Sequence, residues 1–190
     1  MVQRGGAAAE GMTDAGSDAV LSACGRHRWW LQRRWDSAGP RLLFIGLNPS
    51  RADGQRDDPT LRRLVGFAQA WGYGGLEVLN LFSRITASPV VLRRSQEPVV
   101  ACNDVWLAQR VAGLGPQDAV WLGWGNGGRW RQRDRAVLEL LERCLPQGTP
   151  LLVLALTASG QPRHPLYAAA AAQPLRLQHP GDVLRFAAPP

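Results

Sequence analysis

Four short apolar segments alternate with helical patterns along the chain. Residues 41–47 (RLLFIGL), 76–81 (LEVLNL), 118–123 (DAVWLG) and 151–156 (LLVLAL) are largely apolar runs of six or seven residues. Runs of this length and composition are typical of strands that are buried on both faces. We expect them to form the four strands of a core sheet.

Helical patterns separate these strands. Asp58 and Pro59 supply an N-cap and a first-turn proline, and apolar residues then recur at helical spacing up to Trp71. Residues 98–114 and 129–145 have helical patterns in the later connections, and the second is clearer because its apolar residues form one stripe. Strands that alternate with helices predict right-handed crossovers and an α/β fold, a three-layer α/β/α sandwich with a mostly parallel four-stranded core sheet.

The segments outside this core have weaker patterns. Residues 26–35 (RHRWWLQRRW) are aromatic and β-prone, and the turn residues after them predict an N-terminal β-hairpin into the first core strand. Residues 1–25 are expected to be a flexible, solvated tail whose acids interrupt any signal peptide. Residues 168–172 could start a last helix, and 178–190 have the pattern of a short strand and a frayed end. The chain from residue 26 onward is expected to be one domain.

Charge adds a first indication of a partner. The 190 residues carry a formal net charge of +7, and all 22 basic residues are Arg. Basic clusters attract nucleic acid and release its counterions, and Arg binds phosphate in a bidentate manner. A nucleic acid or nucleoside is therefore an expected partner, with a merely solvated basic surface as the alternative. The absence of Lys excludes a P-loop lysine.

Other partners and compartments are not indicated. No apolar stretch is long enough to cross a bilayer, so no membrane association is expected. The three cysteines are widely spaced without a Cys-x-x-Cys pair, which favours reduced thiols in the cytoplasm. Spacings such as His-Glu-x-x-His are absent as well. We expect a cytoplasmic monomer without a metal or another cofactor.

The loop after the first core strand holds the first candidate site residues, because ligands of parallel α/β sheets bind beyond the carboxyl ends of the strands. Asn48 carries both a donor and an acceptor, and Pro49 stiffens the loop around it. The acids Asp53, Asp57 and Asp58 follow, of which Asp58 is expected to cap the helix. An ordinary strand-to-helix turn is the alternative.

Polar residues also follow the second and third strands. A buried amide without a partner costs about 1–3 kcal/mol, so Asn80 needs a partner, either a backbone group or a base edge. Arg84 follows and could contact a phosphate. Gly125 and Asn126 lie in a glycine-rich segment (GWGNGG) before the next helix. That segment is either a plain tight turn or a contact for phosphate or substrate backbone.

The loop after the fourth strand contains His164 between Arg163 and Pro165. A lone histidine is often structural, but this one lies at the edge where the site is expected. Its imidazole could act as an acid, a base or a donor to a developing negative charge. His27 and His179 have no comparable position.

Several strings in the chain are similar to known families. RLLFIGLNPSRAD with DDPT, then VLNLFSRIT, then GQPRHPLY resemble the bacterial domain of unknown function family 1643, from about residue 26 to residue 167. A second likeness is to the uracil-DNA glycosylase superfamily. GLNPS at 46–50 resembles the Gly-x-Asn-Pro-Gly motif of mismatch-specific uracil-DNA glycosylases, and RHP at 163–165 resembles a His-Pro-Ser-Pro motif. VLN at 78–80 is similar to a strand ending in Asn with which several members read a pyrimidine.

The second likeness implies a uracil-DNA-glycosylase-like fold and a nucleobase-binding protein that hydrolyses an N-glycosidic bond. It implies that Asn48 positions the attacking water, Asn80 binds the flipped base, and His164 stabilises negative charge on the leaving base. Asp53 or Asp57 could take the proton of the water. The residues expected to bind substrate lie beside these motifs: Gly46, Pro49, Ser50, Asn80, Arg84, Gly125, Asn126, Arg163 and Tyr167.

The sequence also departs from the superfamily pattern. Ser50 replaces a Gly, and Leu166 with Tyr167 replaces Ser-Pro, so a loop that would wedge into a duplex is not recognisable. A single-stranded nucleic acid, a modified base or a free nucleoside fits better than duplex DNA. A non-catalytic nucleic-acid-binding or regulatory module of the same fold, and a hydrolase or transferase of another small molecule, remain alternatives.

Overall fold

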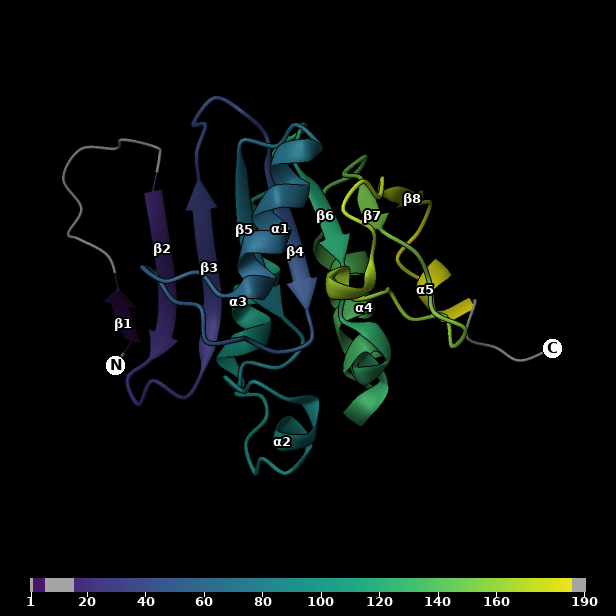
Figure 1. Cartoon of the computed structure of the whole chain (residues 1–190). Coiled ribbons are helices and arrows are strands. Elements are labelled where there is room, and N and C mark those ends of the chain that lie inside the picture. The colour runs from purple at the N-terminus through teal and green to yellow at the C-terminus, as the bar shows by residue number, and fades with distance from the viewer. Residues whose placement is uncertain (1, 6–15, 186–190) are drawn as a thin grey trace.

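The chain folds around one mixed β-sheet with helices on both faces, as a computed structural model of residues 2–5 and 16–185 shows (Figure 1). In these residues the sheet has eight strands in the order β1-β2-β3-β5-β4-β6-β7-β8. The strands are β1 (Val2–Gly5), β2 (Gly16–Ser22), β3 (Arg28–Arg34), β4 (Arg41–Gly46), β5 (Gly75–Asn80), β6 (Ala119–Leu122), β7 (Leu151–Val153) and β8 (Leu175–Leu177). The predicted α/β class is confirmed.

Five α-helices and two 3₁₀ segments connect or follow these strands in the described residues. They are α1 (Pro59–Ala70), α2 (Pro89–Arg93), α3 (Cys102–Ala112), η1 (Gly125–Gln132), α4 (Arg133–Cys144), η2 (Pro165–Tyr167) and α5 (Asp182–Arg185). The start of α1 agrees with the sequence pattern, because Asp58 Oδ1 accepts a hydrogen bond from Leu61 N at 2.8 Å.

The sheet is wider than predicted and not mostly parallel. Strands β5, β4, β6 and β7 pair in parallel and coincide with the four apolar runs. Antiparallel pairings add β3, β2 and β1 on one side and β8 on the other, so the sheet as a whole is mixed and extends beyond the predicted four-stranded core. Polar and exposed residues interrupt β2 and β8, which is why neither stands out as an apolar run.

The N-terminal strands also correct the sequence prediction. Strand β3 forms its hairpin with β2 and not with β4. Strand β5 lies between β3 and β4. Gly74, the residue before β5, is hydrogen-bonded to the segment that joins these two strands: it accepts from Trp35 N and Asp36 N and donates to Pro40 O. Gly16–Ser22 belongs to the sheet and not to a flexible tail, since Ala19 and Val20 are buried in it. Residues 1 and 6–15 of the expected tail lie outside the described residues.

Other element boundaries differ as well. The helix predicted over 98–114 begins only at Cys102, and α2 was not predicted. The helix predicted over 129–145 is an α-helix only from Arg133, because Arg131 and Gln132 have left-handed φ angles of 56° and 55°. Near the C-terminus, β8 and α5 replace the helix expected at 168–172 and the strand expected after 178.

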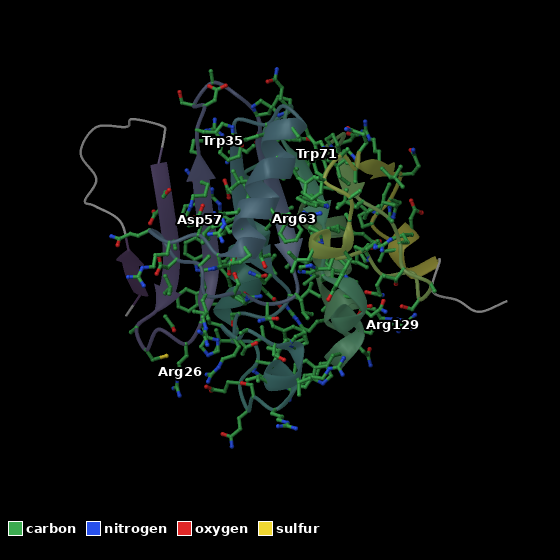
Figure 2. The ribbon with its side chains drawn as sticks, in the orientation of Figure 1. Arg26, Trp35, Asp57, Arg63, Trp71 and Arg129 are labelled. Carbon is green, nitrogen blue, oxygen red and sulfur yellow. The ribbon has the colours of Figure 1, made fainter. Side chains whose placement is uncertain are left out.

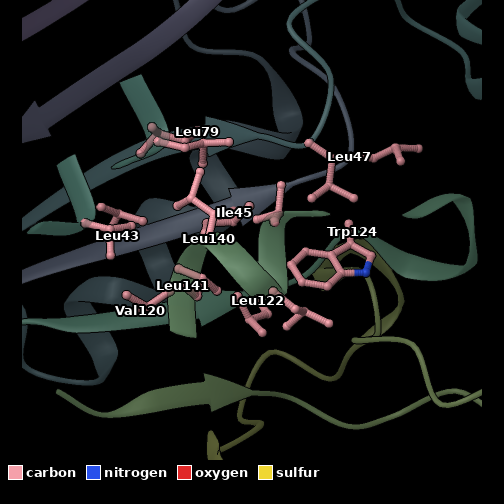
Figure 3. Packing of buried hydrophobic residues seen from close by; sticks show 14 of the residues in the cluster. Leu43, Ile45, Leu47, Leu79, Val120, Leu122, Trp124, Leu140 and Leu141 are labelled. Carbon is pink, nitrogen blue, oxygen red and sulfur yellow. The ribbon is translucent and has the colours of Figure 1, made fainter. Parts of the chain in front are cut away.

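The helices bury opposite faces of the central strands. Helix α1 packs its apolar face against one set of strand residues: Leu42, Phe44, Leu76, Val78 and Trp121. Helices α3 and α4 cover the alternate residues of the same strands: Leu43, Ile45, Leu79, Val120 and Leu122 (Figure 3). Strand β4 connects to β5 on one side, while β6 and β7 extend the sheet on the other. The direction in which successive strands are added to the sheet therefore reverses between β4 and β6. In sheets of this kind, ligand crevices open at such a reversal.

Candidate functional site

A cavity of about 400 Å³ opens at the carboxyl ends of β4, β5 and β6, and we call it the strand-end cavity. Its volume lies within the range of roughly 300–1,000 Å³ that small-molecule sites occupy. It brings together eight of the predicted site residues: Gly46, Asn48, Ser50, Asn80, Gly125, Asn126, His164 and Tyr167. Segments that are far apart in the sequence therefore come together at the carboxyl ends of the parallel strands, where the site was expected.

The remaining predicted site residues do not line this cavity. They are Pro49, Asp53, Asp57, Arg84 and Arg163. Pro49 is buried and shapes the loop, because its carbonyl accepts a hydrogen bond from Thr86 N at 3.1 Å. Arg163 is exposed, and its backbone N–H donates to Ala155 O.

The two acids predicted as bases hold the β4–α1 loop together. Asp57 Oδ1 accepts hydrogen bonds from Arg33 Nε at 2.9 Å and Nη2 at 2.7 Å, beside β3 (Figure 2). Asp53 Oδ1 accepts from the backbone N–H groups of Gln55 and Arg56, which lowers the pKa of its carboxyl group. Neither acid lines the strand-end cavity.

Asn48 is fixed in the cavity wall by Thr86. Its Nδ2 donates to Thr86 O at 2.9 Å, to Thr86 Oγ1 at 3.0 Å and to Pro49 O at 3.1 Å. These bonds engage the donor side of the amide. Asn48 Oδ1 accepts no hydrogen bond from the described residues, so it is an acceptor available to a water or ligand.

Asn80 offers a hydrogen-bond donor, the amide Nδ2, where Asn48 offers an acceptor. It ends β5 and is only 4% exposed, yet its Nδ2 has no hydrogen-bond partner in the described residues. Its backbone oxygen is fixed by Asn103 Nδ2 at 3.1 Å. An unpaired buried donor costs about 1–3 kcal/mol, which a ligand acceptor in the cavity would offset.

His164 is oriented by the segment that it caps. Its Nδ1 accepts a hydrogen bond from Leu166 N at 3.3 Å, so in the neutral ring the proton lies on Nε2. Burial lowers the pKa of His164, so the ring is neutral at pH 7. Arg63 of α1 fixes this segment by donating to Pro165 O at 2.9 Å and to Ala168 O (Figure 2). The Nε2–H group has no hydrogen-bond acceptor among the described residues, so it is a donor available on a residue that lines the cavity.

The glycine-rich segment after β6 is a tight turn that supports the His164 loop. Gly125 has a left-handed φ of 65°, which favours glycine, and its N–H donates to Pro162 O at 2.8 Å. Asn126 Oδ1 accepts hydrogen bonds from Thr157 Oγ1 and Ser159 Oγ, both at 2.7 Å. These polar groups are engaged within the protein, which favours the tight-turn alternative over a phosphate site.

Sequence reasoning missed Arg28, which also lines the strand-end cavity. It is 3% exposed, and its Nη1 donates to Ala52 O. Its Nε has no hydrogen-bond partner and no carboxylate forms an ion pair with it in the described residues. Burial lowers the pKa of Arg28 to about 10, so the side chain remains a cation at pH 7. The sequence pattern placed its strand in an N-terminal hairpin and gave none of its residues a role in the site, so no sequence signal pointed to Arg28.

A second hollow of about 710 Å³ adjoins the strand-end cavity at residues 86–88, and we call it the arginine groove. Its charged lining residues are Arg26, Arg51, Arg84, Arg94 and Glu97. Arg84, predicted to contact a phosphate, therefore lies in a mainly basic groove beside the cavity.

Metal and membrane features are not found in the described part of the chain. No group of three His, Cys, Asp or Glu residues there could hold a metal ion. No helix there is both long and apolar enough to cross a bilayer.

Comparison with known proteins identifies a family and no activity. No curated protein and no solved structure matches the chain significantly. The sequence model of a family described as "Protein of unknown function (DUF1643)" matches residues 28–166, which is well over half of the chain. The matched segment contains Arg28, Asn48, Asn80 and His164, and every residue that lines the strand-end cavity except Tyr167 lies on the part of the sequence that the family shares. The chain belongs to the DUF1643 family.

Proposed function

We propose that the chain binds a nucleobase in the strand-end cavity and hydrolyses its N-glycosidic bond, in a nucleic acid or a nucleoside. The observation that carries this proposal is that Asn48, Asn80 and His164 line one cavity although they follow three different strands. These are the residues for which the likeness to the uracil-DNA glycosylase superfamily implies roles. An α/β sheet with its site at the strand ends fits the fold that this likeness implies.

The chemistry of the cavity suits a planar heterocycle. Apolar side chains supply much of its wall: Phe44, Leu47, Leu61, Leu64, Val78 and Trp124. Asn80 Nδ2 and His164 Nε2–H are donors that have no partner among the described residues, and Asn48 Oδ1 is an acceptor. Apolar walls with a few fixed polar groups are typical of sites that bind and orient a small ligand.

In the proposed reaction, the bond between the base nitrogen and the sugar C1′ breaks. The bonding electron pair goes to the base, and C1′ becomes oxocarbenium-like before a water oxygen adds to it. Asn48 Oδ1 accepts a hydrogen bond from that water and orients it. His164 Nε2–H donates to the negative charge on the base, which an oriented donor can stabilise by about 3–4 kcal/mol.

The proton released by the water goes to the departing base or to solvent, because the cavity lining includes no Asp or Glu. An oxocarbenium-like centre is a strong electrophile and needs little help from a base. The same lack of a carboxylate favours one alternative, a protein that binds a base without cleaving its bond.

The arginine groove extends the proposal to nucleic acid. Four of its five charged lining residues are Arg, and it shares residues 86–88 with the strand-end cavity. A base in the cavity would leave flanking phosphates near this groove, where guanidinium groups bind them and release counterions. Exposing one unstacked base costs less free energy in a single strand than in a duplex, because no base pair has to be broken.

The test uses single-stranded oligonucleotides that contain one uracil, hypoxanthine, xanthine or alkylated base. A glycosylase leaves abasic sites that alkali cleaves, and Asn48→Ala should reduce their rate of formation strongly while leaving oligonucleotide binding in place. A mobility shift without abasic sites would support the binding alternative. An absence of both binding and cleavage with every oligonucleotide would rule out nucleic acid as the substrate, and the same series of free nucleosides then tests the remaining substrate class.

A further inference from the structure

Arg28 places a buried positive charge in the wall of the strand-end cavity, where the carboxylates of Asp58 and Asp53 act on it only from beyond ion-pair distance. Burying a cation without an anionic partner costs several kcal/mol, so buried charges are normally paired. Arg33 lies on the same strand and follows this rule, because it forms an ion pair with Asp57 at 2.7 Å. Arg28 makes no such pair in the described residues, and its Nε also lacks a hydrogen-bond partner.

Arg28 is held close to the end of β5, where Asn80 lies. Its backbone N–H donates to Ser83 O at 2.9 Å, just beyond Asn80 on the same chain segment. Both side chains line the strand-end cavity, and both have a buried nitrogen without a partner: Arg28 Nε and Asn80 Nδ2. The cavity lining includes no carboxylate, and the charges of Asp58 and Asp53 outside it offset the burial of the guanidinium only in part.

We propose that the strand-end cavity selects an anionic oxo-base, with the ionised edge of the ring held by Arg28 and a neighbouring carbonyl oxygen held by Asn80. This inference rests on the proposed function and specifies its substrate class. A buried guanidinium stabilises the deprotonated form of a ligand beside it. Bases with an acidic ring N–H, such as xanthine, therefore fit better than neutral bases such as hypoxanthine, which lacks the second carbonyl group.

Binding of free xanthine and hypoxanthine, measured by calorimetry at about pH 6 and pH 8, tests this inference. We expect the wild-type protein to prefer xanthine by roughly 10–100-fold, as one or two lost charge-assisted hydrogen bonds imply. The preference should be larger at the higher pH, where more xanthine is ionised. Equal affinity for the two bases at both pH values would overturn the inference and leave nucleobase binding intact.

Arg28→Met separates recognition from folding. Removing a buried charge that forms no ion pair relieves its desolvation cost, which offsets the lost hydrogen bond to Ala52 O, so the free energy of unfolding should stay close to that of the wild type while the preference for xanthine disappears. Arg33→Met is the control, because it should lower stability and keep the preference. If Arg28→Met does not fold, Arg28→Lys keeps the charge but not the planar fork, and a weakened but still pH-dependent preference is expected. A full preference retained in either Arg28 variant would contradict the role of this residue.

Benzoate, a planar carboxylate that is not a base, distinguishes the two proposals. Binding of benzoate that depends on Arg28, with no binding of xanthine or hypoxanthine, would support the anionic site and overturn nucleobase recognition.

Discussion

A Cβ atom at Gly46 would lie 2.9 Å from Asn80 Oδ1, its partner across the parallel strands β4 and β5. The same atom would lie 2.9 Å from Phe44 Cε1. Both neighbours are buried and line the strand-end cavity. The small size of Gly46 therefore provides the space in which Asn80 adopts its position.

Gly46→Ala should disturb both stability and binding. Overpacking at this contact is expected to lower the free energy of unfolding by about 1–3 kcal/mol, and displacement of Asn80 should weaken base binding. The control is Gly66→Ala in α1, where a Cβ atom meets nothing within 4 Å and helix propensity predicts a gain of roughly 0.5–1 kcal/mol. Urea denaturation and base titration check both variants. Wild-type binding by Gly46→Ala would show that this contact does not position the site.

Asn80→Ala and Asn103→Ala should have opposite effects. Asn80 Nδ2 makes no hydrogen bond in the described residues, so its removal should change the free energy of unfolding by less than about 1 kcal/mol while base affinity falls roughly 10–100-fold. Asn103 Nδ2 donates to the Asn80 and Leu81 carbonyls, so Asn103→Ala should cost about 1–3 kcal/mol. Thermal denaturation and calorimetric titration compare the two. Unchanged affinity in Asn80→Ala would remove Asn80 from the binding site.

The sequence predicts the core of this fold better than its edges. Continuous apolar runs identify β4 to β7, because both faces of these strands are buried and nearly every position is therefore apolar. Strand β2 is hidden because Gly16, Ser17 and Asp18 are polar or small, and only pairing with β3 reveals its place. The left-handed backbone at Arg131 and Gln132 has no glycine signal, so the late start of α4 could not be predicted.

The candidate site was predictable to the extent that it depends on strand ends. Asn48, Asn80 and His164 meet because parallel strands end at one edge of the sheet. Asp57 forms an ion pair with Arg33, which takes it out of the predicted site. Arg28 reaches the site because β3 pairs with β5. Both follow from antiparallel pairings between distant segments, which no local pattern encodes.

His164 predicts a specific pH dependence of stability. Burial lowers the pKa of His164 in the folded protein below the 6.5 of the free side chain, so protonation favours the unfolded state. Its contribution to stability is fully present above pH 6.5 and is lost as the pH falls through the folded-state pKa. His164→Asn keeps a side-chain acceptor for Leu166 N but does not titrate. The difference in unfolding free energy between wild type and variant should therefore change below pH 6.5, and a constant difference down to about pH 5 would contradict this account.

The same residue should affect turnover. His164→Ala is expected to lower the rate of base release by roughly 10²–10³-fold, because a donor to the leaving base is lost. His164→Asn retains a neutral donor of shorter reach and should keep partial activity. Single-turnover rates with a cleavable oligonucleotide measure both variants. Full activity in a folded His164→Ala protein would assign the residue a structural role only.

Asp57→Asn tests whether the acids of the β4–α1 loop take part in chemistry. Loss of the ion pair with the largely buried Arg33 should lower the free energy of unfolding by about 1–3 kcal/mol. Turnover of the folded fraction should remain close to wild type, since Asp57 does not line the strand-end cavity. Asn48→Ala should show the reverse pattern, with turnover lost and base affinity largely kept. Abolished turnover in folded Asp57→Asn would make Asp57 a candidate base after all.

The most direct test of the central claim is an NMR titration that follows the side-chain amide signals of Asn48 and Asn80 together with the imidazole signals of His164. Addition of a nucleobase should shift all three residues with one saturation curve, because they line one strand-end cavity. The Asn80 amide should shift most strongly, since its Nδ2, which has no partner in the part of the chain that the structure describes, gains a hydrogen bond to the base. Saturable binding of a base that leaves these three sets of signals unchanged would place the ligand elsewhere and contradict the proposed site.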